Sequence, residues 1–165
     1  MKQRTLSILV DNTAGVLSRV AGLFSRRDYN IDSLTVGVTA DNRYSRITVV
    51  ATGDDQVLEQ ITKQVSKLVD VEAVKVLEPE NSVQRELIMI KVRCNASQRQ
   101  DIVSLASIFR ASIIDVSKES IIIEATGAKG KLEALKDLLS GFEILEVART
   151  GVTGLSRGIG DVTYL

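Results

Sequence analysis

The residues with the clearest chemical potential lie in two short segments near the N-terminus. Residues 11–15 (DNTAG) join an alternating apolar run to an amphipathic segment, and Asn30 begins the next apolar run. This order predicts a helix start whose first backbone N–H groups lack partners within the helix, and such groups bind anions. An asparagine amide can donate to a carboxylate and accept from an ammonium group. Asn12, Asn30 and the helix start therefore predict a site for a small carboxylate such as an amino acid.

Each of these residues also has a purely structural interpretation. Asn12 or Thr13 could cap the helix by accepting from a first-turn N–H, and Gly15 could relieve crowding at the turn. Asn30 tolerates the left-handed backbone conformation that can join a helix to a strand. A cap leaves other first-turn amides free for a ligand, so the two interpretations are compatible.

The chain lacks the residues that most enzymes use for acid–base or nucleophilic chemistry. It has no histidine, and its one cysteine, Cys94, falls in phase with apolar neighbours and is expected in a core. Residues 154–158 (GLSRG) match the G-x-S-x-G pattern of serine hydrolases, but no Ser-His-Asp triad can form without histidine. We therefore expect a binding protein with no catalytic residue and no metal site.

Composition narrows the class of partner. Lys plus Arg equals Asp plus Glu at 21 each, so no net charge favours nucleic acid or an anionic membrane. No apolar run approaches the roughly 20 residues that span a bilayer. We expect a cytoplasmic protein without nucleic-acid or membrane partners.

Apolar periodicity predicts the same order of elements twice. Alternating residues predict strands, and apolar residues spaced by three or four predict helices. In the first half we expect strands over 4–10, 31–39, 45–52 and 71–77, and helices over 15–27 and 54–68. In the second half we expect strands over 85–94, 112–117, 120–126 and 142–148, and helices over 98–110 and 129–140. The order β-α-β-β-α-β predicts an α+β chain of two ferredoxin-like units.

Pro79, the only proline, marks the expected boundary between these units. We expect domains over residues 1–78 and 85–165, joined by a linker over 79–84. Each unit would carry helices on one sheet face and leave apolar residues such as Met89 and Ile122 on the other. Such a face predicts self-association into a homodimer or a higher homo-oligomer. The sheets lack the aromatic residues that RNA recognition on this fold requires.

Five segments resemble the small regulatory subunit of acetohydroxyacid synthase (acetolactate synthase). They are residues 11–20 (DNTAGVLSRV), 23–34 (LFSRRDYNIDSL), 64–71 (QVSKLVDV), 109–116 (FRASIIDV) and 146–151 (EVARTG). The match runs in order along nearly the whole chain. It implies an N-terminal ACT domain and a C-terminal ACT-like domain.

The resemblance implies a non-catalytic partner of a large catalytic subunit. That subunit uses thiamine diphosphate, magnesium and FAD to form 2-acetolactate or its homologue, whereas this chain would carry no cofactor. Small subunits of the family raise the large subunit's activity and confer feedback inhibition by a branched-chain amino acid, usually valine. The effector lies where two ACT domains meet. The alternative is a free-standing ACT-type amino-acid sensor that regulates another partner.

Carried onto this sequence, the resemblance implies a polar end and an aliphatic wall for the effector site. Asn12 and the backbone at Ala14, Gly15 and Val16 would hold the polar end, with Asn30 and Ile31 from the partner chain; Leu17 and Leu34 would form the wall.

Two further expectations concern single positions. Asp28 stands where the family usually has glycine, so an aspartate would occupy a position that can demand positive φ. The segment from Arg149 to Arg157 could contact the large subunit.

Overall fold

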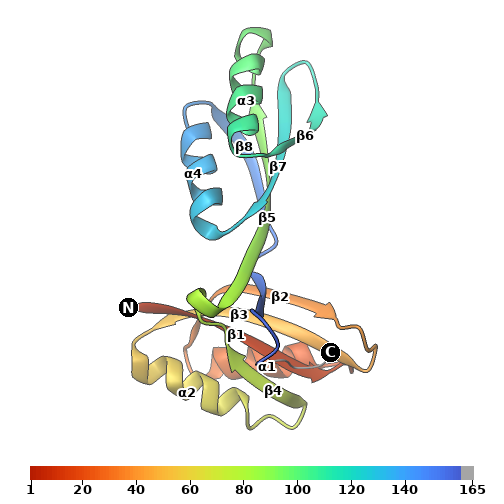
Figure 1. The fold of residues 1–165 in the computed structure, drawn as a ribbon, viewed down its shortest axis with the longest axis vertical. Coiled ribbons are helices and arrows are strands. Elements are labelled where there is room, and N and C mark those ends of the chain that lie inside the picture. Colours follow the sequence, from red (N-terminus) through yellow and green to blue (C-terminus); the bar gives the residue numbers. More distant parts are fainter. Residues whose placement is uncertain (161–165) are drawn as a thin grey trace. The chain divides into compact units, whose positions relative to one another are not determined.

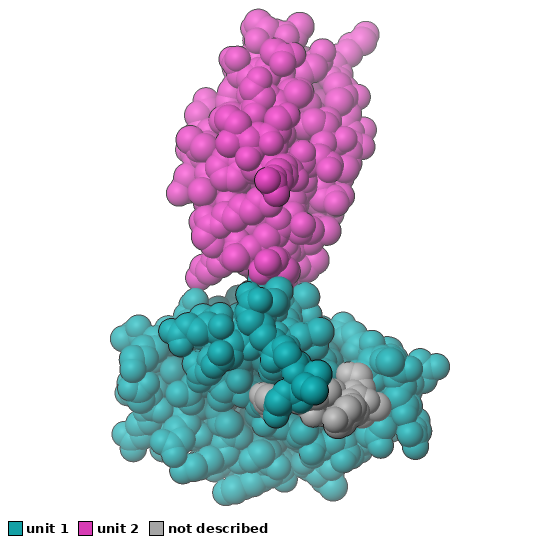
Figure 2. Space-filling model, in the orientation of Figure 1, with its two compact units in different colours: residues 1–84, 152–165 teal, residues 85–151 magenta. Residues whose placement is uncertain are grey.

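The computed structural model describes residues 1–160 and divides the chain into two compact units. Figure 2 colours them separately: unit 1 holds residues 1–84 and the segment from Val152 onward, and unit 2 holds residues 85–151. Each unit has two helices and an antiparallel sheet in the order β-α-β-β-α-β, which confirms the predicted fold class.

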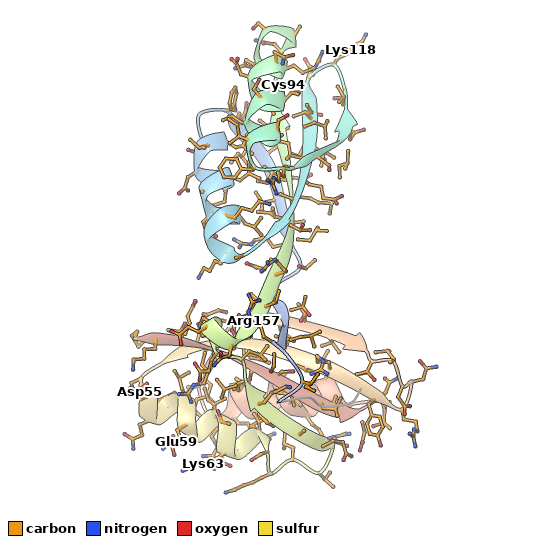
Figure 3. The ribbon with its side chains drawn as sticks, viewed as in Figure 1. Asp55, Glu59, Lys63, Cys94, Lys118 and Arg157 are labelled. Carbon is orange, nitrogen blue, oxygen red and sulfur yellow. The ribbon has the colours of Figure 1, made fainter. Side chains whose placement is uncertain are left out.

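Unit 1 is a four-stranded sheet with two helices packed on one face (Figure 1). Its strands lie in the order β2-β3-β1-β4. The elements are β1 (Lys2–Asp11), α1 (Val16–Arg26), β2 (Asn30–Val38), β3 (Tyr44–Gly53), α2 (Asp55–Val65) and β4 (Val71–Val76). The core is aliphatic except for Phe24. Alternate β1 residues such as Leu6 and Ile8 face the apolar sides of both helices. Asp55, Glu59 and Lys63 occupy the solvent side of α2 (Figure 3), where Glu59 and Lys63 form an ion pair of 2.8 Å.

The boundaries of the units differ from the predicted ones. In place of a linker over 79–84, Pro79–Asn81 forms a short 3-10 helix, η1, and strand β5 (Ser82–Arg93) begins in unit 1 and continues into unit 2. Residues 152–160 belong to unit 1, because strand β9 (Thr153–Ser156) pairs with β5 and the backbone N–H of Arg157 donates to Asn81 O at 2.8 Å. Residues 152–160 of the expected domain 85–165 therefore lie with the first unit, and residues 161–165 of that domain lie outside the described residues.

Unit 2 repeats the pattern with the strand order β6-β7-β5-β8. Its further elements are α3 (Ala96–Ile108), β6 (Ser112–Val116), β7 (Ser120–Gly127), α4 (Lys129–Leu139) and β8 (Glu143–Arg149). Asn95 caps α3 by accepting from the backbone N–H of Gln98 at 2.9 Å. Cys94 is 2% exposed in the core, which confirms its predicted structural role.

The helix-free face of unit 2 is more polar than expected. Met89 is 39% exposed there, but Lys91 on the same strand forms an ion pair of 2.7 Å with Glu146 of β8. Apolar and charged residues therefore alternate along β5 on this face.

Candidate functional site

The helix start after β1 is not capped by a side chain. Gly15 occupies the N-cap position of α1 with φ of +86°, and no side chain accepts from the first turn. The predicted cap by Asn12 or Thr13 is therefore wrong. Asn12 is occupied elsewhere, because its Nδ2 donates to the carbonyl of Asn42 in the β2–β3 hairpin at 2.8 Å. A glycine is required here because other residues adopt such a φ only at a cost.

The missing cap leaves a group of unused donors. Among residues 1–160, no protein atom accepts a hydrogen bond from the backbone N–H of Ala14, Gly15 or Leu17, and Val16 N reaches Thr13 O only at 3.5 Å. These amides lie at the positive end of the helix dipole, which favours a negatively charged group. The free amides of Ala14 and Gly15 are the kind of donor that the predicted carboxylate-binding role of the backbone at residues 14–16 requires; that role stays a prediction.

A cation that sequence reasoning missed lies beside this helix start. A Cβ placed on Gly15 would lie 2.9 Å from Nη1 of Arg19, so the guanidinium borders the turn. Arg19 Nε donates to Asp70 Oδ2 at 2.5 Å, and this hydrogen bond lowers the pKa of Asp70. Arg19 follows Gly15 by four residues, and this spacing places both on one side of the helix. The spacing was therefore a sequence signal for a cation beside the helix start.

Two carboxyl groups lie near this loop, at the end of β1 and on β4. Glu72 of β4 shares a hydrogen bond with Asp11, the last residue of β1, and this contact raises the pKa of Glu72. A neighbouring carboxylate disfavours the charged form of Glu72.

Asn30 begins β2 and is exposed to solvent. Its backbone is extended; the left-handed residue between α1 and β2 is Asp28, with φ of +54°. The structure thus confirms that position 28 demands positive φ. The Nδ2 of Asn30 donates to Asp32 Oδ1 at 2.6 Å. The other oxygen of Asp32 accepts from Gln3 at 3.2 Å and from Thr52, so the carboxylate fixes the amide of Asn30.

Asn12 and Asn30 lie at opposite ends of the sheet within one chain. In the strand register, Asn30 pairs with Thr52, which pairs with Gln3 at the start of β1. Asn12 follows the end of β1, so the length of this strand, roughly 25 to 30 Å, separates the two side chains. A single chain does not bring them together. Only a site built from two chains can contain both.

The predicted aliphatic residues fall into two groups. Leu17 is 44% exposed beside the free amides, whereas the side chain of Val16 is buried in the core. Ile31 and Leu34 are partly buried against that core. Val36 and Val38, 47% and 56% exposed, continue the apolar row of Leu34 along β2. Sequence alternation showed this row, but not that β2 forms an edge of the sheet.

The predicted contact residue Arg149 is engaged within unit 2. Its Nη2 lies 2.9 Å from Glu86 Oε2, and its Nη1 lies 2.5 Å from Glu133 Oε1. The hydrogen bonds from Lys136 and then from Arg149 lower the pKa of Glu133 to about 2. This network stabilises the unit and restricts the guanidinium.

A metal site and a membrane-spanning helix are both absent from the described part of the chain. Residues 1–160 contain no cluster of three or more acidic or cysteine side chains that could hold a metal ion. No helix among them is long and apolar enough to cross a membrane.

Comparisons with known proteins bear on the family of this chain. The family model described as "Small subunit of acetolactate synthase" matches residues 85–158, and the model of an "AHAS small subunit-like ACT domain" matches residues 6–73. The acetolactate synthase small subunit of Mycobacterium bovis is 50% identical over 157 residues, covering 95% of this chain and 94% of its own length. The probable acetolactate synthase small subunit of Archaeoglobus fulgidus is 50% identical, covering 94% of this chain and 98% of its own.

A solved structure gives the same result. The crystal structure of the acetolactate synthase small subunit of Thermotoga maritima superposes with a TM-score of 0.89 at 45% identity, covering 96% of this chain and 99% of that one. Family models, relatives and fold all lead to one assignment, which confirms the resemblance read from the sequence. This chain belongs to the family of acetolactate synthase small subunits.

Proposed function

We propose that this chain is the non-catalytic regulatory subunit that activates the acetolactate synthase large subunit and makes it subject to feedback inhibition by a branched-chain amino acid. Valine is the effector we would test first. Thiamine diphosphate, magnesium and FAD would be held by the large subunit. The observation that carries the effector part is the group of unpartnered amides at the start of α1, beside the guanidinium of Arg19.

The effector site in this proposal is shared between two copies of the chain. The carboxylate of the amino acid would accept from the amides of Ala14, Gly15 and Leu17 of one copy. The ammonium group would approach the amide oxygen of Asn30 of the other copy, whose orientation Asp32 fixes. The distance between these groups within one chain supports a homodimer as the binding-competent form.

Apolar contacts would supply the preference for a branched side chain. Leu17 leaves apolar surface beside the free amides, and Val36 and Val38 do so along the unpaired edge of β2. An exposed edge strand of this kind can also pair with a second copy.

The energetics of feedback are modest. An effector that binds at about 1 mM gains only about 4 kcal/mol. Regulation requires only that the effector favour one state of the complex, and couplings of about 1–3 kcal/mol are typical of allosteric proteins.

Calorimetric titration of the purified chain with L-valine tests the site. We expect saturable binding to the wild type and at least a fivefold weaker affinity in Asn30→Ala. We expect the same in Asn12→Ala, because the Asn12 side chain holds the loop before α1 to the β2–β3 hairpin. Asn42→Ala is the matched control, because Asn42 contacts Asn12 through its backbone carbonyl alone. The proposal fails if neither variant changes the affinity, or if L-valine, L-leucine and L-isoleucine all fail to bind.

Activation is tested separately with the large subunit. Adding this chain to the purified large subunit should raise the rate of 2-acetolactate formation, and L-valine should reverse the increase. A large subunit whose rate is the same with and without this chain would refute the activating role.

A further inference from the structure

Two hydroxyl groups of strand β2 hold a single residue of the C-terminal segment. The backbone N–H of Val152 donates to Ser33 Oγ at 2.7 Å, and Thr35 Oγ1 donates to Val152 O at 3.0 Å. Ser33 and Thr35 are two residues apart, so both side chains lie on the same face of the strand. Both backbone groups of Val152 are thus bound by one strand, and we call this set of contacts the Val152 clamp.

The clamp lies on the strand that carries half of the proposed effector site. Asn30 and Ile31 are at its start, and an irregularity in the pairing of β2 with β3 falls between Ile31 and Ser33. Because β2 is an edge strand, β3 is its only partner in the sheet among residues 1–160. A strand held on one side can shift more easily than a central strand, and hydrogen bonds weaken once the donor and acceptor move beyond about 3.5 Å.

The residue that is held is the first one after unit 2. Unit 2 ends at Gly151, and the chain continues from Val152 directly into β9. β9 is itself tightly fitted, because a Cβ on Gly154 would lie 2.7 Å from Val83 O of strand β5. The start of β5 is also tied to the sheet of unit 1, since Thr5 of β1 donates to the side chain of Gln84 at 3.0 Å.

We propose that the Val152 clamp transmits effector occupancy from β2 to the segment that leaves unit 2. The inference rests on the proposed function and adds how the bound amino acid is sensed. Movement of β2 on binding alters the geometry at Ser33 and Thr35. It thereby displaces Val152, which is covalently joined to unit 2. Without the clamp the amino acid still binds, but its signal is lost.

The test combines Ser33→Ala with Thr35→Val, which remove the two hydroxyl groups and keep the size of the side chains nearly unchanged. Thr48→Val is the matched control. Thr48 lies beside Thr35 on β3, it is 1% exposed, and its hydroxyl has no hydrogen-bond partner among residues 1–160. The control removes an equivalent hydroxyl from the same sheet face without touching the clamp.

Two quantities are measured for each variant: the Kd of the free chain for L-valine, and the L-valine concentration that half-inhibits the enzyme reconstituted with the large subunit. We expect the double variant to keep its Kd within about threefold of the wild type, while the half-inhibiting concentration rises at least tenfold or inhibition disappears. Thr48→Val should match the wild type in both.

Three results would overturn the inference. The double variant could be inhibited as strongly as the wild type, or it could lose valine binding, which would place the hydroxyls in the site or the fold. Thr48→Val could lose inhibition as well, which would show a general effect of the sheet face. By contrast, a wild type that fails to bind valine refutes the proposed function itself, and the inference falls with it. Thr35→Val alone serves if the double variant does not fold.

Discussion

Replacing Arg149 with methionine should destabilise unit 2 before it affects any partner. Arg149 bridges Glu86 of β5 and Glu133 of α4, so it joins a strand to a helix. Methionine retains most of the apolar part of the side chain and removes only the charge and the hydrogen bonds. The variant therefore isolates the electrostatic contribution.

The magnitude follows from the burial of the three side chains. The Glu86 side chain is 7% exposed, and Arg149 and Glu133 are 26% and 34% exposed. Removing one partner of a fully buried pair costs about 3–5 kcal/mol, whereas a surface pair contributes about 0–1 kcal/mol. The pair with Glu86 lies between these limits, and partial access of water to Arg149 reduces its value. We expect a loss of about 2 kcal/mol, which for a unit of this size lowers Tm by about 10 °C.

Chemical denaturation at pH 7 measures the loss, with Lys91→Met as the control. Lys91 lies on β5, as Glu86 does, and pairs with Glu146. The two side chains are 37% and 71% exposed, more than those of Arg149 and Glu86, so replacing Lys91 should cost less than about 1 kcal/mol. A double-mutant cycle with Glu86→Gln should give a coupling energy of about 1–2 kcal/mol. The reasoning is refuted if Arg149→Met costs no more than Lys91→Met. If it is correct, lost activation in an Arg149 variant does not establish a contact with the large subunit.

The remaining substitutions and one titration test separate parts of the structure. Gly154→Ala should lower the free energy of unfolding by about 1–3 kcal/mol, because the new Cβ meets a backbone oxygen at 2.7 Å. In the same denaturation assay, Gly130→Ala in α4 should raise it by up to about 1 kcal/mol, because that Cβ meets nothing described within 4 Å. Gly15→Ala should cost about 1–2 kcal/mol through its φ of +86° and should weaken valine binding in calorimetry; unchanged stability would contradict the left-handed turn. The Glu133 carboxyl should titrate near its folded pKa of about 2 by NMR. Its contribution is complete above its ordinary pKa of 4.5 and is lost as pH falls towards 2, so Glu133→Gln should destabilise the protein more at pH 7 than at pH 2.

The fold was predictable because apolar periodicity is strong in both halves. Every predicted helix and strand exists, with ends displaced by a few residues. β9 was not predicted because it has only four residues and no apolar alternation; its partner, β5, lies about 70 residues away in the sequence. The expected linker failed for a related reason. Pro79 does mark a break between strands, but β5 already begins at Ser82. The start of β5 belongs to unit 1, and the local sequence does not show this assignment.

The residue types of the candidate site can be read from the sequence, but its local geometry cannot. Asparagine and threonine at positions 12 and 13 favour a side-chain cap by propensity. In the structure the amide of Asn12 binds the carbonyl of Asn42, a residue thirty positions away that only the β2–β3 hairpin brings close. Local preference was overruled by a tertiary hydrogen bond, and the result was a helix start with more free donors than the sequence indicated.

The separation of Asn12 from Asn30 changes what regulation requires of this chain. A ligand that bound both within one chain would need no partner, and its affinity would not depend on association. Strand β1 keeps the two asparagines apart, so the proposed site would be complete only when two chains meet, and ligand binding would then be linked to dimerisation. The affinity for valine should therefore rise with protein concentration until the chain is dimeric. Analytical ultracentrifugation with and without L-valine measures this linkage, and a monomer that binds valine with undiminished affinity would show that the site lies within one chain.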